Sequence, residues 1–191
     1  MVAGNRDYLV ELDQQNGDGD LGISMAAGFL AVRDYLSSVE EKDLGRIFMK
    51  CGAVFNEAAP SSLGTIISFG FMGMARALKG KEEAAAGELA LAMEAGISNI
   101  MEKAKSKPGE KTILDSLVPA VEALKAHAGE TPAARYGAAA KAAAEGSEAT
   151  RNMRSVHGRA AYYGDQSIGV LDGGSVVGKL IFQGLKDWAD T

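Results

Sequence analysis

The chain has 191 residues, of which 47% are hydrophobic, a formal net charge of −5 and one cysteine, Cys51. This length suits a single domain over residues 1–191, and the acidic balance argues against a nucleic-acid or anionic-membrane partner, which would need a basic surface. One cysteine excludes an internal disulfide, no run of about 18 apolar residues could span a membrane, and a cytoplasmic protein is predicted.

Hydrophobic residues recur with helical spacing along almost the whole chain. In chain order, helices are expected over 23–36, from a capping box at 38–41 to about 55, from 60–62 to a stop near 80, over 82–103, over 112–127, over 131–152 and over 175–188. Few segments are typical of strands, and short loops join neighbouring helices, as in antiparallel assemblies. The sequence therefore predicts an all-α fold, with Cys51 in its core.

Three carboxylates, Asp13, Asp18 and Asp20, are gathered with three glycines between residues 13 and 22. At an effective dielectric of 20, two charges about 4 Å apart repel by on the order of 4 kcal/mol. A fold that collects such groups usually neutralises them with a hard cation that prefers oxygen ligands. Glycines also let backbone amides approach a phosphate or a metal.

Three interpretations of this acidic stretch compete: a solvated turn, a calcium loop and a magnesium–nucleotide site. A calcium-loop register starting at Asn16 places Asp18 and Asp20 at the third and fifth positions. The register then fails, with Leu21 instead of Gly at the sixth position and Ala27 instead of Glu at the twelfth. The remaining motifs favour the magnesium–nucleotide site over the turn.

Four further segments between helices are richer in functional groups than a connection requires. Ser61 and Ser62 stand at a helix start, where anions bind favourably, although plain capping explains them equally well. Arg159 is a candidate for bidentate phosphate contact, although a lone arginine is more often a surface charge. The segments 107–115 and 172–175 fit both a turn with a cap and a ligand contact. The sequence assigns no role to His157 and contains no P-loop motif.

Taken in order, these segments resemble the nucleotide-binding L subunit of the dihydroxyacetone kinases. The matching motifs read Asp-x4-Asp-Gly-Asp-x-Gly, Ser-Ser-x-Gly-Thr, Pro-Gly-Glu-Lys-Thr-x-x-Asp, Gly-Arg-Ala-x-Tyr and Ser-Ile-Gly-x-x-Asp-x-Gly. They extend from Asp13 to the C-terminal helix, and five motifs in family-like order make the resemblance specific. It implies a barrel of about eight antiparallel helices that holds ADP or ATP and two magnesium ions at one end.

The resemblance also implies site residues, matched position by position. Asp13, Asp18 and Asp20 match the metal-binding aspartates, which would carry the catalytic role together with Arg159. The nucleotide-binding positions are Leu21, Gly22, Ile23 and Ser24 beside the phosphates, Ala59, Ser61 and Ser62 in a phosphate loop, Ala104 and Ile113 around the adenine, Arg159, and Asp172, Gly173 and Gly174 in a second contact loop.

Several positions depart from the family pattern. Leu21 stands where family members often carry His or Thr, and Gly173 replaces the usual Pro. Because only twelve residues precede Asp13, the first helix of the family's barrel is expected to be short or missing.

The resemblance implies a kinase subunit that acts together with a second protein. It would hold Mg-ADP or Mg-ATP for phosphoryl transfer to dihydroxyacetone, or to a related triose or ketose, bound on a separate K subunit. In one family mode, a phosphotransferase-system subunit rephosphorylates the bound nucleotide, and in the other ATP exchanges freely; a stand-alone chain favours the first. The alternative is a non-catalytic ADP- or ATP-binding module that regulates a partner.

Overall fold

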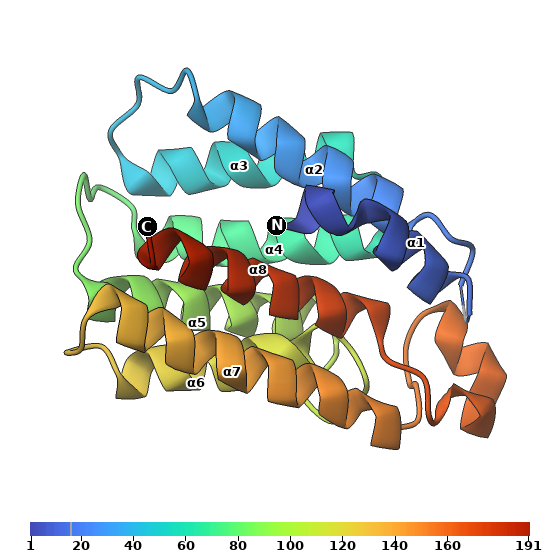
Figure 1. Cartoon of the computed structure of the whole chain (residues 1–191). Coiled ribbons are helices and arrows are strands. Elements are labelled where there is room, and N and C mark those ends of the chain that lie inside the picture. Colours follow the sequence, from blue (N-terminus) through green and yellow to red (C-terminus); the bar gives the residue numbers. More distant parts are fainter. Residues whose placement is uncertain (16) are drawn as a thin grey trace.

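Eight α-helices form a barrel in the computed structural model, which describes residues 1–15 and 17–191 and contains no strand within them (Figure 1). The helices are α1 (Arg6–Asp13), α2 (Leu21–Leu36), α3 (Leu44–Ala58), α4 (Ser62–Ala77), α5 (Ala86–Ala104), α6 (Leu114–Ala126), α7 (Pro132–Ala149) and α8 (Gly173–Ala189), with 3₁₀ turns η1 (Val2–Asn5), η2 (Thr150–Asn152) and η3 (Arg159–Ser167). The predicted all-α fold is confirmed. Asn16, the first position of the calcium-loop register, lies outside the described residues.

Consecutive helices pack against one another and reverse direction at each connection (Figure 1). The N-terminal elements close the ring, because α1 and η1 each contact both α2 and α8. The first helix, which was expected to be short or missing, is therefore present as the eight-residue α1 and completes the barrel. As a consequence of the alternation, α2, α4, α6 and α8 begin at the barrel end where α1, α3, α5 and α7 finish.

Two apolar clusters fill the interior. One includes Leu9, Met25 and Phe55 from the first helices, and the other joins α5, α6, α7 and α8. Gly146 of α7 packs so closely on α6 that an added Cβ would collide with a backbone carbonyl, so this contact requires glycine. Cys51 is in the core as predicted, and burial raises the pKa of its thiol to about 11, which keeps it protonated at neutral pH.

Side-chain caps explain where three helices begin. Ser61 accepts a hydrogen bond from the amide of Gly64 at 3.1 Å, and Thr131 accepts one from the amide of Ala134 at 3.3 Å. Both helix starts agree with the sequence prediction. α8 begins at Gly173, two residues before the expected start, because the carboxylate of Asp172 caps it by accepting the third amide of the helix.

Two other helix starts differ from the prediction because carboxylates cap the chain further along. The capping box predicted at 38–41 is wrong, since Asp43 caps α3 by accepting the amide of Arg46. α5 also begins later than expected, since the carboxylate of Glu88 accepts the amide of Ala85 at 2.9 Å. Within the described residues, no helix is both long and apolar enough to cross a membrane.

Candidate functional site

A cavity of about 930 Å³ opens at the barrel end where the even-numbered helices begin. It is lined by the starts of α2, α4 and α8, by residues just before α6, by the end of α1, and by the connection between α7 and α8. This connection, residues 150–172, contains η2 and η3 and is drawn in orange in Figure 1. The volume is in the range that accommodates a small-molecule cofactor.

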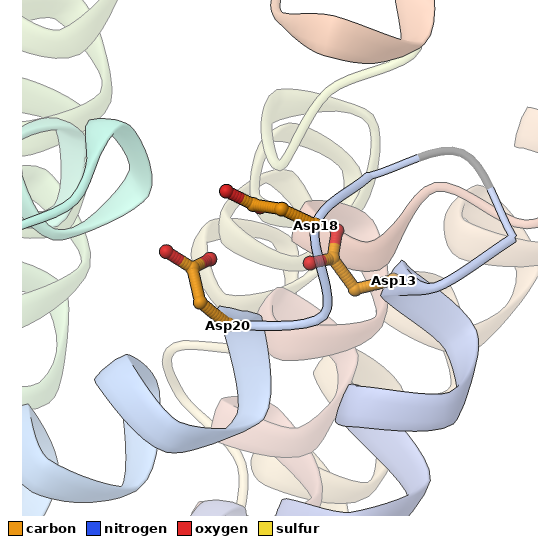
Figure 2. A group of neighbouring side chains, drawn as sticks. All are labelled: Asp13, Asp18 and Asp20. Atoms are coloured by element: carbon orange, nitrogen blue, oxygen red, sulfur yellow. The ribbon is translucent and has the colours of Figure 1, made fainter.

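Three carboxylates gather at this cavity, from the end of α1, the following loop and the residue before α2 (Figure 2). One oxygen each of Asp13, Asp18 and Asp20 lies within 4.8 Å of the others. Oδ2 of Asp13 accepts the amides of Gly19 at 2.8 Å and Leu21 at 3.4 Å, which fixes the loop around it. The structure thus brings together the predicted ligands, and such a cluster of oxygens suits a hard divalent cation such as Mg²⁺.

Negative charge dominates this cluster. Desolvation, followed by the charges of Asp18 and Asp13, raises the pKa of Asp20, and the charge of Arg159 opposes that rise. Nη2 of Arg159 lies 2.8 Å from Oδ2 of Asp18. Among the described residues, Arg159 is the one cation that forms an ion pair with this cluster, and it pairs with Asp18 alone, so the three carboxylates keep a surplus of negative charge that a divalent cation would neutralise.

The start of α4 provides a second, electropositive part of the cavity. Ser61 already acts as the helix cap through its hydroxyl, and Ser62 is the first helical residue; both line the cavity. The first amides of a helix have no partner within the helix and carry the positive end of its dipole. Together with the starts of α2 and α8, this arrangement suits an anion such as a phosphate.

Asp172, Gly173 and Gly174 form the start of α8 on the cavity wall. Burial by the surrounding groups raises the pKa of Asp172 to about 7, and the charge of Asp115 adds to this rise, whereas the hydrogen bond from the amide of Ser175 opposes it. A Cβ atom on Gly173 would lie 2.5 Å from Cδ2 of Leu21. Leu21 therefore occupies space that a larger residue at position 173 would need, which links the two departures from the family pattern.

Two cavity residues to which the sequence assigned no role make contacts across the fold. Lys111 is 4% exposed, and its Nζ donates to four backbone carbonyls of the 150–172 connection at 2.6–3.2 Å. Nε2 of His157 lies 2.7 Å from Oε2 of Glu110. Both lie in or beside segments that the sequence singled out, but their partners are 39 to 59 positions away, beyond any local pattern.

Most of the predicted site residues line the cavity: Asp13, Asp18, Asp20, Leu21, Ser24, Ser61, Ser62, Ile113, Arg159, Asp172, Gly173 and Gly174. The other four lie outside the lining, with Gly22 packed against α1, Ile23 exposed on α2, Ala59 buried after α3 and Ala104 at the end of α5. Asn56 of α3 also lines the cavity, and no sequence motif had indicated it.

Comparison with known proteins gives matches along almost the whole chain. A sequence model of the DAK2 domain matches residues 15–187. The chain is 32% identical over 184 residues to the ADP-binding subunit DhaL of PEP-dependent dihydroxyacetone kinase 1 from Listeria innocua, an alignment covering 96% of this chain and 88% of the relative. It is 31% identical over 172 residues to the corresponding ADP-binding subunit DhaL from Escherichia coli, covering 88% and 81%.

The fold is also similar to a solved structure, the dihydroxyacetone kinase from C. freundii in complex with AMP-PNP and Mg²⁺. The TM-score is 0.79 at 22% sequence identity, with 98% of this chain aligned. The chain spans only 31% of that kinase chain, and at this identity the similarity shows the fold alone.

Replacing Asp20 by Asn tests the surplus of negative charge. Asp20→Asn should raise the Tm of the metal-free protein, because it removes one of three repelling charges. Among the described residues the Asp20 side chain makes no capping hydrogen bond to α2, so the substitution removes no such bond. It should also weaken Mg²⁺ affinity by about tenfold or more, roughly 1.4 kcal/mol. Thermal unfolding in EDTA and across a Mg²⁺ titration measures both effects.

The matched control is Glu11→Gln, an exposed carboxylate of α1 outside the cavity lining, which should change neither quantity. A lower metal-free Tm for Asp20→Asn would show that its carboxylate supports the fold instead of being repelled.

Proposed function

Because the chain belongs to the DAK2 domain family, we propose that it is the nucleotide-binding subunit of a dihydroxyacetone kinase. The observation that carries this proposal is the meeting of an acidic cluster with three helix starts in one cavity. A cluster of oxygens suited to a metal lies beside helix starts suited to an anion, a combination that a magnesium–nucleotide complex would require. The relatives from L. innocua and E. coli, both ADP-binding subunits by name, support the same assignment.

The acidic residues would hold the metal against the nucleotide. Asp13, Asp18 and Asp20 would ligate two magnesium ions, which when bound neutralise charge on the transferred phosphoryl group. Arg159, paired with Asp18 in this structure, would exchange that carboxylate for phosphate oxygens. Its planar guanidinium can hold two such oxygens at once, which a lysine cannot do.

The helix starts would bind the rest of the nucleotide. The first amides of α2 and α8, with Gly173 and Gly174 allowing close approach, would bind phosphate oxygens. Ser62 is the better candidate for a hydroxyl contact at α4, since Ser61 is engaged as the cap. Ile113, which lines the cavity, would flank the adenine together with Ala104 at the end of α5.

The phosphoryl acceptor would be dihydroxyacetone, or a related triose or ketose, held by a separate K subunit. Phosphoryl transfer depends on positioning and charge neutralisation more than on covalent chemistry from the protein, and the cavity offers both. Because the relatives are PEP-dependent by name, the mode we favour keeps the nucleotide bound while a phosphotransferase-system subunit rephosphorylates it.

Nucleotide binding should depend on magnesium. We expect calorimetry to show that EDTA weakens ADP binding by about tenfold or more, at least roughly 1.4 kcal/mol, because the phosphates would then face unneutralised carboxylates. Asp18→Asn should bind ADP in Mg²⁺ about as weakly as the wild type does in EDTA, with an unchanged circular dichroism spectrum. Equal affinities with and without EDTA would reject a metal bridge.

Arg159 should contribute through its shape as well as its charge. Arg159→Lys is expected to raise the Kd for Mg-ADP about tenfold, or ~1.4 kcal/mol, because a point charge cannot reproduce a fork on phosphate oxygens. Arg154→Lys is the matched control, since it lies on the same connection, pairs with Asp165 and is outside the cavity lining. An unchanged Kd in Arg159→Lys would leave Arg159 as a surface residue.

Kinase activity should require the partner. The purified chain with ATP and Mg²⁺ is expected to form no appreciable dihydroxyacetone phosphate, and a cognate K subunit should restore transfer by bringing the acceptor to the cavity. Positioning of this kind can contribute roughly 7–11 kcal/mol. Robust turnover by the chain alone would overturn the subunit assignment. Absence of turnover with a proven partner and phosphoryl donor would point to a regulatory nucleotide-binding module.

A further inference from the structure

The connection 150–172 forms one wall of the cavity without an apolar core of its own. Its three buried residues, Thr150, Ser155 and Ser167, are all polar. Apolar burial is the main force that holds packed elements in place. Leu171, near the end of the connection, packs against the apolar core, but the part before it depends mainly on hydrogen bonds to keep its conformation. It carries Arg159 and leads directly into Asp172, which makes its conformation important for the cavity.

The ammonium group of Lys111 is the centre of these hydrogen bonds. Its Nζ donates to the carbonyl oxygens of Thr150 at 2.9 Å, Met153 at 3.2 Å, Ser167 at 2.6 Å and Val170 at 2.7 Å. The acceptors lie near both ends of the connection, so one side chain holds the two ends together. Hydrogen bonds from a charged donor are roughly twice as strong as those between neutral groups.

The backbone around Lys111 is fixed in an unusual conformation. Its φ of 60° lies in the left-handed region, which is uncommon for residues other than glycine. The carboxylate of Asp115 accepts the amides of Gly109 at 2.6 Å and Thr112 at 2.7 Å, on either side of Lys111. A conformation of this kind persists where its surroundings determine it, and here it directs the side chain into the connection.

The same ammonium is linked to the start of α8. Desolvation lowers the pKa of Lys111, and the charge of Asp172 opposes this change. The amide of Asp172 donates to Oγ1 of Thr150 at 3.1 Å, and the carbonyl of Thr150 accepts from Lys111. The cap of α8 and the lysine therefore share one hydrogen-bonded network.

We propose that Lys111 is a positioning residue whose buried ammonium holds the connection 150–172 in the conformation that presents Arg159 and Asp172 to the cavity. Without this ammonium, four carbonyl dipoles would converge on a space that contains no donor, which is unfavourable for buried acceptors. The connection would then open to solvent while the apolar barrel stays folded. The consequence for nucleotide binding rests on the proposed function, whereas the consequence for the connection does not.

Hydrogen–deuterium exchange on the nucleotide-free protein tests the effect on the connection. In Lys111→Met, amides of 153–171 should exchange at least about tenfold faster, with those of α2, α4 and α7 unchanged. Lys105→Met is the matched control, because Lys105 also has a positive φ, of 53°, but is exposed. Equal acceleration throughout the helices, or unchanged exchange in 153–171, would overturn the proposal.

A second variant separates the charge from the packing of the side chain. Lys111→Gly accommodates the positive φ and leaves space for n-butylammonium, a probe that carries both a stem and an ammonium group. Addition of n-butylammonium chloride should restore slow exchange in 153–171, whereas n-butanol at the same concentration should not. Should Lys111→Met fail to fold, recovery of helical circular dichroism in Lys111→Gly by the same two compounds gives the same comparison. Equal rescue by butanol would overturn a role for the charge.

Nucleotide affinity supplies the final readout. The Kd for Mg-ADP should rise about tenfold in Lys111→Met and stay within about twofold in Lys105→Met. An unchanged Kd in Lys111→Met, with faster exchange in 153–171, would overturn the claim that the connection presents its residues to the nucleotide. Failure of the wild type to bind Mg-ADP would count against the proposed function, and the exchange experiment would still decide the role of Lys111.

Discussion

The alternation of helix direction around the barrel is the constraint on which the site depends. Because each helix reverses the chain, α2, α4, α6 and α8 all begin at one end. Helix starts present unpaired amides and positive dipole ends, whereas the helices that finish there present carbonyls and negative ends. An anion is therefore favoured beside α4 and α8, and a cation is favoured beside the end of α1, where Asp13 stands.

The cavity joins an acidic cluster whose charge is not fully neutralised to a polar wall that is held mainly by hydrogen bonds. The acidic cluster holds more negative charge than Arg159 neutralises, and desolvation adds to the mutual repulsion that raises the pKa of Asp20. The wall next to this cluster is the polar connection 150–172, which is held by the ammonium of Lys111 and by the pairing of His157 with Glu110. Segments that bury little apolar surface open more readily than packed helices, so this wall can adapt while the barrel keeps the carboxylates in place.

The sequence predicted the helices well where apolar spacing and a local cap agreed, as at Ser61 and Thr131. It failed at 38–41, because several carboxylates and hydroxyls stood within reach of the same helix start, and the geometry of the chain favoured Asp43. Local hydrogen bonds of this kind differ by only about 1 kcal/mol, so composition alone cannot rank them. The barrel itself was implied by family resemblance, since short loops indicate antiparallel neighbours and leave open whether the ring closes.

The sequence by itself determined the acidic cluster, because Asp13, Asp18 and Asp20 lie within eight positions and a single bend brings them together. It also marked Arg159 and the start of α8 as candidates for a common site. Only the tertiary structure decided that Arg159 pairs with Asp18 and that Lys111 holds the wall which carries it. Local patterns describe neighbours along the chain, whereas these contacts join residues more than 35 positions apart, whose approach depends on how the whole barrel packs.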